Sequence, residues 1–145
     1  MVLQAQNQDQ IDIARVGSIT TTEGHESHFT GNVRVNHTIR GGHPPNISGG
    51  IVIFEPGART VWHSHPKGQR VIIIQGVGWV QQWGGPKIEV HPGDVIWIPP
   101  NVKHWHGATT TTGVSHYAFA EIHENNGSHN VENMESVTDI QYNGR

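Results

Sequence analysis

Residues 57–76 read GARTVWHSHPKGQRVIIIQG, and this stretch carries the strongest signal for both fold and chemistry. His63 and His65 stand one residue apart, and side chains at positions i and i+2 of a strand point to the same face of a sheet. Gln69 follows residues 66–68 (PKG), a break at which the chain can turn back. The stretch therefore predicts two strands joined by a turn, with two imidazoles projecting together.

A second stretch repeats the paired histidines about forty positions further along the chain. Residues 93–108 read GDVIWIPPNVKHWHGA, so His104 and His106 again stand one residue apart. If the two pairs lie on facing strands, their imidazoles converge on one point. A ligand set of imidazoles and an amide oxygen suits manganese, iron, cobalt, nickel or zinc better than calcium. The spacing thus predicts a site for one divalent metal ion. The alternative is that the pairs are unrelated polar positions on two strands.

Short apolar runs separated by turn-forming residues occupy the middle of the chain. Turn signals every eight to twelve residues or so are typical of an all-β sandwich or barrel. Residues 23–29 and 40–50 are expected to be loops. Thr138 and Gln141 have capping-box spacing, which predicts a short C-terminal helix. The expected strands are 51–54, 71–74, 78–80, 87–90, 95–98 and 114–121.

The chain has 145 residues, a formal charge of −3, twelve histidines and no cysteine. This length suits one domain, and the lack of cysteine excludes disulfides and thiolate ligands. Basic blocks and long apolar runs are absent from the sequence, so we expect neither nucleic acid nor a membrane as a partner. Residues 1–10 lack the charged start and apolar core of a signal peptide. A cytoplasmic location is therefore expected, or a periplasmic one if a leader has been removed.

Glycines bracket the first histidine pair at distances that resemble a motif of the cupin family. Gly57-x5-His63-x-His65-x3-Gln69-x6-Gly76 is similar to the first cupin motif, G-x5-H-x-H-x3,4-E-x6-G. The departure is Gln69, which stands where that family usually has a glutamate ligand.

The second cupin motif, G-x5-P-x-G-x2-H-x3-N, resembles Gly93-x5-Pro99-x-Asn101-x2-His104. Asn101 replaces a glycine, but asparagine adopts a left-handed turn conformation more readily than most residues. Ala108 replaces the final asparagine. Agreement at these set distances implies an all-β cupin fold, which is a jelly-roll-like antiparallel β-barrel, with the short C-terminal helix added to it.

Expectations for the domain and its assembly follow from the same resemblance. Residues 13–145 are expected to form a single cupin domain, and residues 1–12 a mobile N-terminal arm. An open barrel leaves unpaired backbone groups on its edge strands, which favours association of subunits. We expect a homodimer or homotetramer with the arm as a contact.

Four further segments resemble the bacterial manganese-dependent cupin hydroxynitrile lyases, and equally the carboxymuconolactone-decarboxylase-like cupins. They are residues 29–33 (FTGNV), 54–60 (FEPGART), 103–108 (KHWHGA) and 137–142 (VTDIQY). The resemblance implies one divalent ion, with manganese favoured and iron, zinc, nickel or cobalt as alternatives. The ligands that it implies are His63, His65, Gln69 and His104.

The lyases share the amide that this chain has at Gln69. A neutral amide leaves the ion with one more net positive charge than a carboxylate would, which favours a divalent Lewis acid over higher oxidation states. The alternative is that Gln69 does not bind, so that three histidines and water hold the ion.

Two more histidines match residues near the metal in the lyase family. His106 shares its strand face with His104 and is expected to be the base that removes the proton of a cyanohydrin hydroxyl. His116 would steady the departing cyanide or pass it a proton. The alternatives are that His106 only orients a ligand and that His116 is a buried structural histidine. Ala120 stands where the family has a pocket glutamine, and this departure bears on how cyanide is handled.

The expected activity is cleavage or formation of cyanohydrins, so the expected partner is a small-molecule substrate that yields an aldehyde or ketone plus cyanide. One alternative is an iron-dependent cupin dioxygenase that uses the same ligands. Another is a non-catalytic small-molecule-binding cupin. All remain open, because a fold does not determine a reaction.

The remaining aromatic and charged residues have simpler interpretations. Strand alternation points Trp62 and Trp105 away from the paired histidines, so we expect them to pack in the interior or at a subunit contact. Arg59 and Glu55 are candidates for an ion pair near the barrel rim. The other histidines lack paired spacing and are expected on the surface or in loops: His25, His28, His37, His43, His91, His123 and His129.

Overall fold

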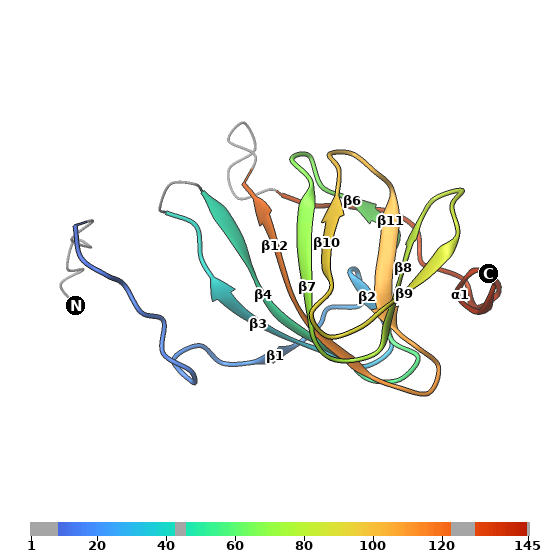
Figure 1. Ribbon diagram of the computed structural model, residues 1–145, viewed down its shortest axis with the longest axis horizontal. Helices are drawn as coiled ribbons and strands as arrows, with labels where there is room; N and C mark the ends of the chain where they lie inside the picture. The colour runs from blue at the N-terminus through green and yellow to red at the C-terminus, as the bar shows by residue number, and fades with distance from the viewer. Residues whose placement is uncertain (1–8, 43–45, 123–129, 145) are drawn as a thin grey trace.

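The structure is a computed structural model that describes residues 9–42, 46–122 and 130–144. Within these ranges the chain forms thirteen strands in two sheets and one short helix (Figure 1). The first sheet contains, in spatial order, β1 (Thr22–Glu23), β3 (Val33–Ile39), β4 (Ile47–Phe54), β12 (Val114–Glu121), β7 (Gln69–Gly76) and β10 (Val95–Ile98). The second contains β13 (Glu132–Asn133), β6 (His63–Ser64), β11 (His104–Ala108), β5 (Arg59–Thr60) and β2 (Phe29–Thr30), with β8 (Gly78–Gln82) beside β11 and β9 (Lys87–Val90) beside β8. The helix is α1 (Asp139–Asn143).

Neighbouring strands within each sheet run antiparallel, and the two sheets curl toward each other as the walls of a half-barrel (Figure 1). Their facing sides enclose one apolar core, because alternate residues of each strand point inward. This architecture confirms the expected all-β, jelly-roll-like antiparallel barrel. The core residues are Val33, Val35, Val52, Phe54, Ala58, Val71, Ile73, Val90, Ile98, Ala108, Val114 and Ala118.

Strand β12 shows how the alternating pattern positions the interior. Its burial alternates along all eight residues, so that His116, Ala118 and Ala120 are buried while Tyr117 is on the outer face. Its bounds coincide with the expected strand 114–121, and β9 and β10 likewise coincide with the expected strands 87–90 and 95–98.

The expected loop over residues 40–50 is wrong at its end, because β4 begins at Ile47. Gly49 and Gly50, at the end of the expected loop, lie inside this strand, where neighbouring backbone leaves no room for a side chain. A Cβ atom on Gly50 would lie 1.8 Å from Asn36 O, and one on Gly49 would lie 2.0 Å from Ala118 O. These glycines therefore mark a close approach of strands, which a single sequence does not distinguish from a turn.

The C-terminal helix packs on the outer side of β11 through a second apolar cluster. Thr138 Oγ1 accepts from Gln141 N and Gln141 Oε1 accepts from Thr138 N, which confirms the predicted capping box. The prediction that two of the tryptophans pack in the interior is also confirmed. The cluster consists of Trp62, Trp105, Val137 and Tyr142.

The expected pairing of Arg59 with Glu55 is wrong. Arg59 is buried, and its guanidinium donates to Val137 O and to Asp139 Oδ1, at 2.8 and 2.9 Å respectively. It also lies 4.4 Å from the centroid of the Tyr142 ring. Arg59 thus connects β5 to the start of α1, a contact between residues about eighty positions apart that strand spacing cannot predict.

Some expectations concern residues that the structure does not describe. His43, His123, His129 and residues 1–8 of the expected N-terminal arm lie outside the described ranges. In the part of the chain that is described, α1 is far too short to cross a bilayer, and no other helix is present to do so.

Candidate metal centre and ligand cavity

Three histidines from β6 and β11 bring their ring nitrogens together inside the half-barrel. His63 lies directly opposite His104 in the pairing of these strands, and alternation places His106 on the same face as His104. All three are buried, and each contributes one ring nitrogen to a group in which these atoms lie within 4.8 Å of one another. This group could hold a metal ion.

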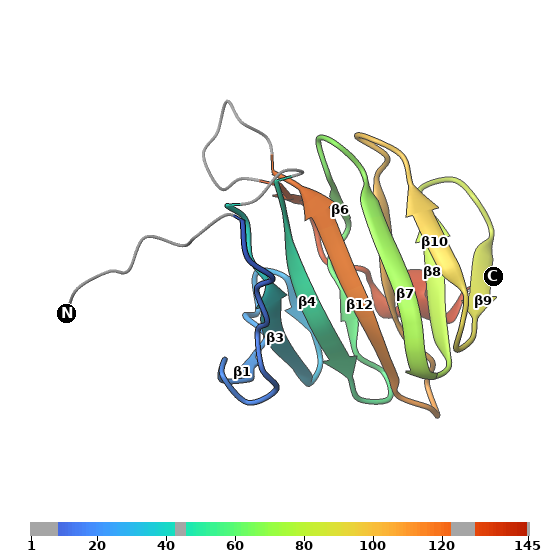
Figure 2. The same cartoon turned by 60° about the vertical axis from the view of Figure 1, so that its left-hand side comes forward.

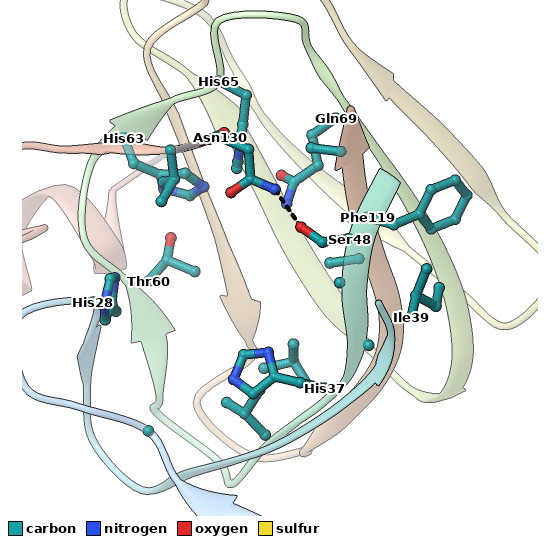
Figure 3. Close-up of a pocket in the computed structure, with 18 of the residues that line it drawn as sticks. His28, His37, Ile39, Ser48, Thr60, His63, His65, Gln69, Phe119 and Asn130 are labelled. Atoms are coloured by element: carbon teal, nitrogen blue, oxygen red, sulfur yellow. Dashed lines mark hydrogen bonds between the residues drawn. The ribbon is translucent and has the colours of Figure 1, made fainter. Parts of the chain in front are cut away.

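His65 and Gln69 lie beside the three rings. The centroid of the His65 ring is 5.1 Å from that of His63, and Gln69 Oε1 lies 3.3 Å from His104 Nε2. Figure 3 shows His63, His65 and Gln69 gathered at one end of a cavity. The structure therefore brings all four predicted ligands together, and His106 with them.

Backbone carbonyls fix the protonation pattern of three of these imidazoles. The Nδ1 atoms of His63, His65 and His104 each lie against a carbonyl oxygen, that of Val61, Asn130 and Val102 respectively. A ring nitrogen beside a carbonyl must carry the proton, so each neutral ring presents the lone pair of Nε2. This is the arrangement by which outer hydrogen bonds orient metal-binding histidines.

Two of the ring nitrogens that face the centre lack hydrogen-bond partners among the described residues. His65 Nε2 and His106 Nε2 are buried and unpaired among the described residues. His104 Nε2 and Gln69 Oε1 face each other as two acceptors, a contact that a cation between them would stabilise. Unpaired nitrogen lone pairs and an amide oxygen around one point fit a divalent transition metal.

Burial keeps the clustered imidazoles neutral. It lowers the pKa of His104 to about 4, and it lowers the pKa of His65 as well. The pKa values of His63 and His106 lie well below 6.5, first because of burial and then because of neighbouring imidazoles, which are His104 for His63 and His116 for His106. Neutral imidazoles are the form that binds metal ions, so the cluster is ready to bind without first losing protons.

His106 is connected to His116, which lies one layer behind it. His106 Nδ1 and His116 Nε2 are 3.1 Å apart, so one of the two donates to the other. His116 is buried against Phe54, and burial lowers its pKa to about 4. When His106 donates through Nδ1, its Nε2 keeps a lone pair. Of the two histidines, only His106 lines the cavity, so its Nε2 can reach a bound molecule.

The cavity has a volume of about 630 Å³ and opens between the two sheets. Its deep end holds the buried polar groups, its walls are mainly apolar, and the buried Ala120 is among the small residues that leave it open. The apolar wall includes Phe29, Val35, Val52 and Ala118.

Several residues of this cavity were not predicted from the sequence. Thr60 lines it next to the cluster, and its hydroxyl oxygen accepts from His106 N at 3.2 Å. His37, expected on the surface, is exposed but lines the cavity as well, as does His28. The spacing of His37 from Val35 was a usable signal, because side chains two residues apart in a strand point to the same face and both of these line the cavity.

The fold and the histidine cluster define a cupin, and the chain belongs to the cupin family. The cupin domain, Cupin_2, matches residues 50–118. Among individual proteins, the chain is similar to the (R)-mandelonitrile lyase of Granulicella tundricola. The two are 47% identical over 132 residues, which is 91% of this chain and 98% of that protein.

Solved structures show the same fold. A cupin-like protein from Thermotoga maritima is 39% identical to the chain with a TM-score of 0.76, and the match covers 91% of this chain and 95% of that one. A cupin-2 domain protein from Rhodospirillum rubrum has a TM-score of 0.66 at 15% identity and covers 85% of this chain and 80% of its own. At that low identity the second likeness concerns the fold alone.

Proposed function

We propose that this chain is a metal-dependent hydroxynitrile lyase that cleaves a cyanohydrin into an aldehyde or ketone and cyanide. The observation that carries the proposal is His106, a buried neutral imidazole of the histidine cluster that also lines an apolar cavity. The likeness to the (R)-mandelonitrile lyase over nearly the whole of that protein supports the same chemistry.

The metal would be held by His63, His65, Gln69 and His104, with manganese as the favoured ion. A divalent ion bound there would act as a Lewis acid that makes a cyanohydrin hydroxyl easier to deprotonate. Gln69, as a neutral ligand, would not reduce the positive charge of the site as a carboxylate would.

The chain's own residues would handle the proton. His106 Nε2 accepts the hydroxyl proton of the cyanohydrin, the carbon–carbon bond breaks, and its electron pair leaves with cyanide. The protonated His106 is then stabilised through Nδ1 by His116 Nε2, to which it donates. His106 returns the proton to cyanide, so that hydrogen cyanide and the carbonyl product leave and the enzyme is restored.

The cavity wall favours an apolar substituent on the cyanohydrin carbon. Phe29, Val35 and Val52 can pack against an alkyl or aryl group and exclude water from the reacting bond. Thr60 holds the backbone of His106 in place through its hydroxyl oxygen. The Ala120 side chain offers cyanide no hydrogen bond, so return of the proton depends on His106, which His116 supports through Nδ1.

The test pairs metal analysis with an assay. The purified protein is analysed for bound metal, and cleavage of racemic mandelonitrile is measured before chelation, after chelation, and after manganese, iron, zinc, nickel or cobalt is restored. We expect about one ion per chain and activity that chelation removes and manganese restores best. No cleavage by the fully loaded protein would contradict the proposal.

Other outcomes identify the competing functions. Oxygen consumption with a diketone or flavonol by the iron-loaded protein would support a dioxygenase. Tight binding of an aldehyde without turnover would support a non-catalytic small-molecule-binding cupin.

A further inference from the structure

The cavity changes character from its deep end to its mouth. Its deep residues are buried and include His63, His65 and His106, whereas the exposed residues that line it mark the opening. At the opening, basic side chains outnumber acidic ones, since Glu23 is the acidic residue among the described lining. The basic residues are His25, His28, His37 and Arg40.

Two of these basic residues have no partner within the described ranges. His25 is hydrogen-bonded to Ser27, and His28 contacts Asn133. In contrast, His37 and Arg40 make no side-chain hydrogen bond or ion pair with a described residue. Among the described residues, nothing therefore competes with a ligand for their polar groups.

The position of His37 makes it a natural contact for the far end of a bound molecule. It follows Val33 and Val35 on the inward face of β3, and Arg40 comes directly after that strand ends. Figure 3 shows His37 on the wall of the cavity opposite His63 and Gln69. A ligand whose head lies at the cluster would thus extend past the apolar walls toward His37.

The size of the cavity leaves room for such an extension. Cavities of about 300–1,000 Å³ hold drug-sized ligands, and the 630 Å³ here lies in the middle of that range. A simple aryl aldehyde would fill only part of it. The remaining space lies beside the basic mouth.

We propose that the natural substrate carries a carboxylate at the end remote from the reacting carbon, and that Arg40 and His37 bind this carboxylate at the cavity mouth. The position of the reacting end of the substrate, at the histidine cluster, rests on the proposed function. The position of the carboxylate end rests on the residues that line the cavity mouth. An arginine guanidinium is suited to this role because it binds a carboxylate through two parallel hydrogen bonds.

The kinetic test compares mandelonitrile with its 4-carboxy analogue. We expect wild-type kcat/KM to be at least about tenfold higher for the carboxylate, since that factor corresponds to ~1.4 kcal/mol and one charge-assisted contact supplies as much. Arg40→Gln should reduce this preference about tenfold, and His37→Ala should reduce it less. Arg15→Gln is the matched control, because Arg15 is exposed and does not line the cavity.

A binding test separates this inference from the proposed reaction. Titration calorimetry with benzaldehyde and 4-formylbenzoate measures the preference for a carboxylate without requiring cleavage. If no cyanohydrin is cleaved but 4-formylbenzoate binds more tightly than benzaldehyde and Arg40→Gln removes this difference, the proposed reaction is wrong and the carboxylate site at the mouth is supported. If mandelonitrile is cleaved and the carboxylate gives no advantage in either test, the reaction stands and the inference is overturned.

Discussion

At the scale of single residues, a backbone carbonyl determines what each clustered imidazole can do. Val61 O, Asn130 O and Val102 O each lie against an Nδ1 atom, so Nε2 is the atom left for a ligand on His63, His65 and His104. His106 differs, because its Nδ1 faces another imidazole. This difference in hydrogen-bond partner separates the expected ligands from the expected base.

His106→Ala should abolish cleavage while leaving the metal in place, because all four predicted ligands remain. A fall in kcat of at least about 100-fold is expected for the loss of a general base. Metal content by elemental analysis and mandelonitrile turnover are the two measurements. His91→Ala serves as the control, since His91 is exposed and pairs with Glu89. Loss of the metal together with the activity would instead indicate that His106 is a ligand. Its ring nitrogen lies close enough to those of His63 and His104 for that role.

Gln69→Glu tests the role of the neutral amide. The added carboxylate should hold the ion at least as well, but it should reduce the acidity of a bound hydroxyl because it cancels one positive charge. We expect kcat at pH 7 to fall by roughly tenfold and the pH–rate profile to move to higher pH. Gln69→Ala separates this charge effect from loss of a ligand. An unchanged profile in Gln69→Glu would indicate that position 69 does not contact the ion.

The buried imidazoles should make the metal-free protein sensitive to acid. The pKa values of His104 and His116 are lowered by burial from 6.5 to about 4, so between these values the unfolded chain binds protons that the folded chain does not. Stability should therefore fall as pH drops from 6.5 to 4, by on the order of 2 kcal/mol per histidine at pH 5 relative to pH 7. Urea unfolding at the two pH values measures this. Equal stability at both would contradict the burial of neutral rings.

At the scale of elements, strand β11 serves two layers at once. His104 and His106 both belong to the buried group with His63, and His106 also lines the cavity. Trp105, between them, packs under α1 against Tyr142. The helix thus supports the strand that carries two of the cluster histidines.

The anchor of that helix gives a prediction about stability. Arg59→Ala removes three hydrogen bonds of a buried guanidinium and its contact with Tyr142, so we expect a loss of about 2–3 kcal/mol. Asp139→Asn should cost less than about 1 kcal/mol, because the Asp139 side chain is 88% exposed and its charge is screened by water. Chemical denaturation of both variants gives the comparison. Equal losses would show that the ion pair, rather than the buried contacts, holds the helix.

Sequence patterns predicted the bounds of strands well where burial alternates along the strand. They did not predict contacts between residues that are far apart in the sequence. β9, β10 and β12 matched because each run is apolar or alternating and ends in a turn. The four expected ligands also converge, since the spacing of the cupin motifs reflects their common geometry. The partners of Arg59 and the cavity position of His37 were missed, because they depend on distant strands and on which side of the sheet faces the cavity.

At the scale of the whole molecule, an apolar row crosses the outer face of the first sheet. Tyr117 pairs with Ile51 on one side and Ile72 on the other, and Ile72 pairs with Val95, so an apolar row crosses four strands. Figure 2 shows this face turned toward the viewer, with α1 behind the sheets. Exposed residues on this outer face are Ile53, Ile74, Val95, Trp97 and Tyr117.

We expect a second copy of the chain to cover this face. An apolar row that crosses the middle of a sheet matches itself when two identical faces meet across a two-fold axis, and sheets pack face to face about 10 Å apart. Single exposed apolar residues are ordinary, but a contiguous set across four strands marks an interaction surface. The expected assembly is a homodimer, or a homotetramer if a second contact is added.

Tyr117→Glu combined with Val95→Glu should convert the assembly to monomers, because it places charges at the centre of the buried row. Analytical ultracentrifugation measures the mass, and elemental analysis checks that the metal site survives. Ile88→Glu is the matched control, since Ile88 is 54% exposed on β9 of the other sheet and should leave the mass unchanged. A monomeric wild-type protein, or a double variant that keeps its mass, would show that this face is not the contact.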